Sequence, residues 1–253
     1  MHLNVIRKHL FNYDKLDVLN LFAHRYEHGM NNLNTSEIRQ FLGENFSVPV
    51  NRDAFEFLTA LCTKYDYMKN LVQHQITSTS RCKSCGDTKV ITNNNVLLSI
   101  FIDNLNKKSY NLNDLLNTFS HWYQSYDKSC ECCGRNDLLI KNELTLTKEI
   151  VIIRLAKFSL QNDNNKLVKM PQKFNLSTIP TTKVLIAEQQ YKVMNAIFHH
   201  GSSIEEGHYT SMCREGRFWI EINDAQIQKK QWPRGAKDIY ILFLQKSFNK
   251  NMY

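Results

Sequence analysis

Two short cysteine motifs constrain the fold of this chain more than any other feature of its sequence. Cys82-Lys83-Ser84-Cys85-Gly86 and Cys130-Glu131-Cys132-Cys133-Gly134 are both C-x-x-C-G knuckles, and a long segment separates them. In each knuckle a tight turn brings two sulfurs together, and the glycine lets backbone N–H groups point toward a thiolate. Two knuckles supply the four thiolates of a closed tetrahedral zinc site. The motifs therefore predict that a structural zinc ion joins the two ends of a β-ribbon with little core of its own.

The second knuckle contains a third cysteine, so the ligand set has an alternative. The spacing favours Cys82, Cys85, Cys130 and Cys133 as ligands and leaves Cys132 as a bystander, but Cys132 can also replace a neighbour. Seven cysteines are an odd number, and in a reducing compartment paired cysteines bind metal more often than they form disulfides. The competing interpretation is four thiols around a lost metal site.

The composition is that of an ordinary soluble globular protein. The chain has 253 residues, of which 42% are hydrophobic and 22% charged, enough to bury a substantial core. No apolar run reaches the length of a membrane span, and residues 1–8 do not resemble a secretory signal. We therefore expect no membrane partner and a cytoplasmic or nuclear location. The net charge is +8, but the basic residues are scattered, which argues against nucleic acid as a partner.

The periodicity of apolar residues changes along the chain from helical to alternating. Helices are expected at residues 16–26, at 34–42 behind an Asn34/Glu37 capping box, and from about 49 to 61. Alternation from about residue 71 indicates a β-ribbon, and a short helix is expected at 113–119. Further strands are expected at residues 90–91, 96–102, 150–155, 184–187, 191–198, 208–214, 218–222 and 239–244. The order of elements is helices, then a β-ribbon, then a sheet. This order predicts the α+β fold class.

A histidine and a side-chain amide lie on neighbouring strands of one predicted hairpin. Gly207-His208-Tyr209-Thr210 opens the first strand, Glu215-Gly216 supplies the turn, and the second strand runs to Asn223 and Asp224. Thiol proteases place a general base and the group that orients it in this way. As neighbours in a strand, Asn223 and Asp224 are expected to point to opposite faces, so that only one of them can be the direct partner of His208.

These segments together resemble the ubiquitin-specific proteases, a papain-like family of deubiquitinating enzymes. The resemblance covers the chain from about residue 15 to its end and rests on five ordered matches. They are the helix motif at residues 52–58, the two cysteine knuckles, the strand at 149–159 with the following segment 170–176, the His box at 207–210 with 219–224, and the closing strand at 239–243.

The resemblance implies a hand-like fold within a single domain, residues 1–253. It places a partial helical thumb at 1–75, zinc-bearing fingers at 76–146 and a β-palm with the His box at 147–253. It implies a thiol hydrolase that cleaves isopeptide bonds at the C-terminus of ubiquitin, with ubiquitin or a ubiquitinated protein as partner. His208 would be the general base, Asn223 would hold its imidazole in the useful tautomer, and Asp224 would assist electrostatically.

The chain departs from the family pattern at the nucleophile. The family's Gly-Asn-Thr-Cys-Tyr/Phe box precedes the thumb helices, yet residues 1–50 contain no cysteine. We therefore expect either an N-terminally truncated product or a non-catalytic relative, inactive as it stands. Arg52 also replaces a family glutamine, and Lys157 replaces a family arginine. The alternative functions are a ubiquitin-binding scaffold without chemistry and a zinc-ribbon nucleic-acid binder.

Several other residues are expected to have structural roles. Cys62 near a helix end and Cys213 on the His208 strand are expected to pack in the core. Asp53 is expected to cap a helix or to be solvated. His199 and His200 are expected on a solvent-exposed loop.

Overall fold

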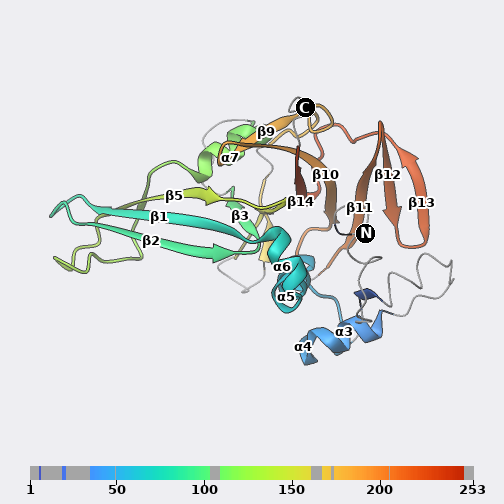
Figure 1. The fold of residues 1–253 in the computed structure, drawn as a ribbon, viewed down its shortest axis with the longest axis horizontal. Helices are drawn as coiled ribbons and strands as arrows, with labels where there is room; N and C mark the ends of the chain where they lie inside the picture. Colours follow the sequence, from blue (N-terminus) through green and yellow to red (C-terminus); the bar gives the residue numbers. More distant parts are fainter. Residues whose placement is uncertain are drawn as a thin grey trace, which may run out of the picture.

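The computed structural model describes residues 6, 19–20, 35–48, 50–102, 109–160, 167–171, 174–204 and 206–247 (Figure 1). Most of the helix predicted at residues 16–26 and the predicted cap residue Asn34 lie outside these residues. Strands dominate the described part, and short helices precede them, so the fold class is α+β as the sequence predicts. No helix in these ranges is long and apolar enough to cross a membrane.

The helices whose bounds the structure describes before the first strand begin at residue 36. They are α3 (Ser36–Leu42), α4 (Glu44–Ser47), α5 (Ala54–Lys64) and α6 (Asp66–Val72). The N-cap of α3 is Thr35, whose side chain makes no capping hydrogen bond, so the predicted capping box begins this helix one residue too early. The predicted start of α5 near residue 49 is also wrong, because Asp53 is the N-cap and its carboxylate accepts from the Phe55 N–H at 2.9 Å. The helix α6 was not predicted from the sequence.

A four-stranded antiparallel sheet forms the long extension on the left of Figure 1. Its order is β2 (Thr88–Asn95), β1 (His74–Cys82), β5 (Leu138–Leu146) and β4 (Tyr123–Ser125). Most of its side chains are exposed or half-buried, and the buried cluster at its far end consists of Cys82, Cys130 and Leu138. The predicted ribbon with little core of its own is confirmed.

An eight-stranded sheet forms the body of the molecule. Its order is β13 (Gln226–Lys230), β12 (Phe218–Asn223), β11 (His208–Glu215), β10 (Gln189–His200), β14 (Ile239–Lys246), β6 (Ile150–Ala156) and β3 (Leu98–Phe101), with β9 (Lys183–Ile186) also pairing β10. Within it β3 and β6 pair in parallel and the other pairs are antiparallel. Gly216 takes the positive φ of 58° in the turn between β11 and β12, where the hairpin was predicted.

Helices cover the two faces of this sheet (Figure 1). On one face α5 and α6 pack against Ile150, Ile152 and Tyr240. On the other face lies α7 (Leu112–Phe119), a helix that the sequence predicts. A capping box formed by Asn111 and Asp114 begins this helix. A separate two-stranded sheet joins β7 (Phe158–Leu160) to β8 (Leu167–Lys169).

The segment predicted as fingers, residues 76–146, contributes to both sheets. It contains β1 for most of its length and the whole of β2, β4 and β5, but also β3 and α7, which belong to the eight-stranded sheet and its cover. The division into thumb, fingers and palm stays a prediction.

Candidate active site and metal centre

Four cysteine sulfurs converge at the far end of the four-stranded sheet. The Sγ atoms of Cys82, Cys85, Cys130 and Cys133 all lie within 4.8 Å of one another. The Cys82–Cys133 pair is 3.6 Å apart and the Cys85–Cys130 pair 3.7 Å. A tetrahedral zinc ion with Zn–S bonds of about 2.3 Å places its sulfurs about 3.8 Å apart, so this donor set fits such an ion. Cys132 is exposed and is not a member of the group.

The two knuckles have matching backbone geometry. Gly86 and Gly134 take positive φ angles of 76° and 71°, and their N–H groups donate to the carbonyls of Cys82 and Cys130 at 2.9 and 2.8 Å. The Cys85 N–H donates to the Cys82 sulfur and lowers the pKa of that thiol to about 7. At Cys85 and Cys133 a backbone N–H also acts to lower the pKa, but burial and the neighbouring sulfurs raise it overall, to about 12 for Cys85. The turn geometry thus favours the thiolate form at Cys82.

At the opposite end of the molecule, the imidazole of His208 meets the side chain of Asn223. The distance from His208 Nε2 to Asn223 Oδ1 is 2.6 Å. His208 opens β11 and Asn223 closes β12, and the antiparallel register of these strands brings the two ends together. Asp224 Oδ2 lies 3.9 Å from the same nitrogen. The His208 side chain is 46% exposed.

The prediction that the side chains of Asn223 and Asp224 point to opposite faces is wrong. The strand ends at Asn223, and Asp224 enters the turn toward β13 with a φ of 50°, which breaks the alternation of a strand. Both side chains therefore approach His208. The amide oxygen makes the hydrogen bond, whereas the carboxylate is 82% exposed and contributes only a screened charge.

This geometry selects one tautomer of His208. An amide oxygen can only accept, so Nε2 carries the proton that it donates to Asn223. In the neutral ring Nδ1 then keeps its lone pair and can take a proton from a thiol. This contact fits the roles predicted for His208 as a general base and Asn223 as its orienting group, and these roles stay predictions.

No cysteine of the chain is placed as a nucleophile for that base. Burial raises the pKa of the Cys62 thiol to about 12, and burial likewise raises the pKa of Cys213. Cys213 lies five residues beyond His208 on the same strand, so its side chain points to the opposite face. The other five cysteines lie in or beside the metal-type cluster.

Residues 8–244 match the protein family described as ubiquitin carboxyl-terminal hydrolase. The chain belongs to this family. Among curated ubiquitin carboxyl-terminal hydrolases, number 4 of Vanderwaltozyma polyspora is 26% identical over 239 residues, which is 84% of this chain and 26% of the relative. Number 13 of Saccharomyces cerevisiae is 27% identical over 128 residues, 48% of this chain and 16% of the relative. The chain thus spans about a quarter or less of the length of these relatives.

Solved structures of ubiquitin-specific proteases share the fold. The SAGA Ubp8/Sgf11/Sus1/Sgf73 DUB module bound to ubiquitin aldehyde gives a TM-score of 0.70 at 17% identity, covering 98% of this chain and 63% of that one. The same module bound to monoubiquitin gives 0.69 at 19% identity, covering 91% and 58%. The expected ubiquitin-specific protease fold is therefore confirmed.

Asp53 ties α5 to the eight-stranded sheet. One carboxylate oxygen caps the helix, and the other accepts from the Tyr240 hydroxyl at 2.8 Å. The Tyr209 hydroxyl accepts from the Ala54 N–H at 3.5 Å. Tyr209 directly follows His208, so the helix and the strand that carries the imidazole are held together. The sequence predicted the capping role of Asp53 but not its contact with Tyr240.

Behind the His208 strand lies a buried polar pair. His199 is 1% exposed, not on a solvent-exposed loop as predicted, because β10 extends through it and Phe158 and Tyr209 pack on its ring at 5.3 and 4.8 Å. In the described part of the chain neither of its ring nitrogens has a hydrogen-bond partner. The same holds for Lys157 Nζ, which is buried nearby. Burial, and then the Lys157 charge, lower the pKa of His199.

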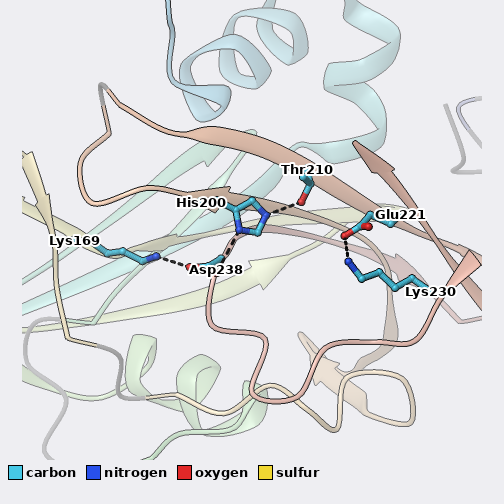
Figure 2. Close-up of polar contacts among 6 residues, drawn as sticks. All are labelled: Lys169, His200, Thr210, Glu221, Lys230 and Asp238. Carbon is cyan, nitrogen blue, oxygen red and sulfur yellow. Dashed lines mark hydrogen bonds and ion pairs between the residues drawn. The ribbon is translucent and has the colours of Figure 1, made fainter. Parts of the chain in front are cut away.

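His200 joins Thr210 and Asp238 in a further set of polar contacts, on the face of the sheet that carries Thr210 (Figure 2). His200 Nε2 and the Thr210 hydroxyl share a hydrogen bond of 2.9 Å, and His200 Nδ1 lies 3.4 Å from Asp238 Oδ2. Asp238 in turn binds Lys169 at 2.5 Å. Because His200 pairs with His208 across β10 and β11, these contacts fix the strand ends beside the candidate base. The side chain of His200 is 43% exposed, as expected, but the residue ends β10 and does not lie on a loop as predicted.

Proposed function

We propose that this chain is a deubiquitinase-type domain of the thiol hydrolase class that binds ubiquitin. Membership of the ubiquitin carboxyl-terminal hydrolase family supports the class. The observation that carries the proposal is the 2.6 Å contact between His208 Nε2 and Asn223 Oδ1, which leaves Nδ1 as the free base. In the reaction of this class, Nδ1 takes a thiol proton and the resulting thiolate attacks the carbonyl at the ubiquitin C-terminus. The C–N bond to the leaving amine then breaks, and the imidazolium returns the proton to that amine.

We further propose that residues 1–253 alone do not hydrolyse this bond. The cysteines are buried with raised pKa values, face away from His208, or gather in or beside the four-sulfur cluster. Without a thiol at Nδ1 the covalent step is lost, and removal of one member of such a pair costs as much as removal of both. The domain then acts as a ubiquitin-binding scaffold.

A fluorogenic ubiquitin C-terminal amide and labelled ubiquitin test the two parts of the proposal. We expect saturable ubiquitin binding without turnover. Turnover that His208→Ala abolishes and His121→Ala preserves would overturn the inactivity but support the base. Turnover that survives His208→Ala would overturn the base itself. Absence of saturable ubiquitin binding would contradict the scaffold function.

We also propose that Cys82, Cys85, Cys130 and Cys133 hold one structural zinc ion. The sulfur separations of 3.6 and 3.7 Å support it. Such an ion has no open coordination position and supplies folding energy rather than catalysis. Metal analysis of the purified protein should find about one zinc ion per chain, and Cys85→Ser should remove it. Zinc retained by that variant would contradict the assignment.

A further inference from the structure

The outer edge of the eight-stranded sheet is the strand β13. It pairs with β12 over five residues, from Gln226 opposite Asn223 to Lys230 opposite Trp219. In the part of the chain that the structure describes, no strand pairs with its other side. All five residues are exposed, and none is a proline or a bulge. An edge of this kind offers unpaired backbone groups to another chain.

The register shows which backbone groups are free. A two-residue turn separates Asn223 from Gln226, so these two residues form a hydrogen-bonded pair. Hydrogen-bonded and non-hydrogen-bonded pairs alternate along an antiparallel ladder. Ile227 and Lys229 therefore occupy non-hydrogen-bonded positions, and their N–H and C=O groups point away from β12. Two residues thus present two donors and two acceptors at the outer edge.

The side chains of the same two residues lie on one face, where they join an apolar strip. Ile227 is 61% exposed and lies opposite Ile222, and Lys229 lies opposite Ile220. The Lys229 ammonium is held 3.1 Å above the ring centroid of Phe218, which is itself 52% exposed. The edge therefore shows an apolar position and, two residues on, a cation held in place.

The other face of the hairpin is already satisfied. Lys230 binds Glu221 at 2.6 Å (Figure 2), and Gln228 donates to the second oxygen of the same carboxylate at 2.9 Å. The two adjacent lysines of β13 thus differ in whether their charge is paired. The Lys230 charge is neutralised by Glu221, whereas in the described residues the Lys229 charge is not paired with a carboxylate. Recognition by this edge must come from the Lys229 face.

We propose that β13 accepts an extended segment of a partner protein as an additional antiparallel strand, with an acidic residue opposite Lys229 and an apolar residue opposite Ile227. Because the added strand is antiparallel to β13, its acidic residue comes first in the sequence. One residue of any type and then the apolar residue follow. Charge complementarity selects this occupant over a second copy of the chain. Two β13 strands paired antiparallel about Gln228 would place Ile227 opposite Lys229, and β13 has no acidic residue that could neutralise the Lys229 charge. The site begins two residues after Asp224, and β12 and β13 separate a bound segment from the His208 strand β11.

Proline and charge-reversal variants separate backbone pairing from side-chain recognition. Ile227→Pro removes an outward N–H but no hydrogen bond to β12, a placement that edge strands tolerate. Lys229→Glu keeps the edge and reverses its charge. Lys183→Glu makes the same charge change on β9 and is the matched control. The probe is a labelled peptide that repeats Glu-Thr-Val-Thr, and a second peptide carries Lys in place of Glu.

Anisotropy titration of the full chain should show saturable binding of the Glu peptide below about 0.5 mM. Lys229→Glu should weaken it about tenfold or more and should gain affinity for the Lys peptide. Ile227→Pro should abolish binding, and Lys183→Glu should leave it unchanged. Hydrogen exchange should show new protection at the Ile227 and Lys229 amides.

The proposal is overturned if the Glu peptide does not saturate, or if both β13 variants bind it as the wild type does. It is also overturned if sedimentation shows that the edge is occupied by a second copy of the chain. Because binding is measured without turnover or ubiquitin, failure here leaves the proposed hydrolase-type function untouched, and failure of that function leaves this result untouched.

Discussion

The amine of Lys157 is predicted to destabilise the folded protein near neutral pH. Its side chain is 2% exposed, and its Nζ has no hydrogen-bond partner in the described part of the chain. Burial, with a smaller contribution from the Lys169 charge, lowers the pKa of Lys157 from 10.5 to about 7, while Asp238 opposes the change. In the unfolded chain the amine has its ordinary pKa of about 10.4.

The cost follows from this difference in pKa. Near pH 7 the unfolded chain binds a full proton at Lys157 and the folded chain only part of one, so stability must rise as pH increases from about 7 to about 10.5. The full pKa difference corresponds to about 5 kcal/mol at most, and relaxation of the surroundings reduces this to about 2–4 kcal/mol. Methionine has a similar length and no charge, so Lys157→Met should recover that amount near pH 7.

Urea denaturation followed by tryptophan fluorescence measures the effect, with zinc present throughout. We expect Lys157→Met to raise the free energy of unfolding near pH 7 and to lose most of this gain near pH 10. Lys183→Met, on the exposed side of β9, should show no such gain. Destabilisation by Lys157→Met near pH 7, or a gain of equal size at both pH values, would refute the reasoning.

Three further changes test the anchors of the fold and of the site. Asp53→Ala removes the cap of α5 and the acceptor of a tyrosine hydroxyl from β14, so the free energy of unfolding should fall by about 2–3 kcal/mol in urea denaturation, and by less for Asp53→Asn. Chelation should release zinc and increase hydrogen exchange in β1 and β5 but not in β10; in a colorimetric zinc assay Cys133→Ser should lose the metal and Cys132→Ser should retain it. Asn223→Ala should eliminate the protected imidazole N–H resonance of His208 in proton NMR, and Asn223→Asp should keep it; a resonance that survives the alanine change would contradict the hydrogen bond.

The strands of the eight-stranded sheet were predictable because their side chains alternate or form continuous apolar runs. Strands β6, β10, β11, β12 and β14 bury at least one face, and burial is what the sequence pattern records. Strand β13 escaped prediction because all five of its residues are exposed. Only its pairing with β12 makes it a strand.

The candidate site was predictable as a set of residue types but not in its detail. The spacing of His208 and Asn223 reflects a hairpin register, which a turn with Gly216 fixes locally. The position of Asp224 depends on one positive φ angle that neither its type nor its neighbours demand. Burial of His199 depends on Phe158 and Tyr209 packing over it, a contact between distant segments. Tertiary contacts of this kind leave no periodic signal in the sequence.

The parallel pairing of β3 with β6 limits how the molecule can be taken apart. β3 lies between the two halves of the four-stranded sheet in sequence, yet it forms the outer edge of the other sheet, opposite β13. A protein engineer who exchanged residues 76–146 for the corresponding piece of another protein would also exchange that edge strand and the helix that covers it. Grafts should therefore join within β1 and β2 on one side and within β4 and β5 on the other, so that β3 and α7 stay with their own sheet.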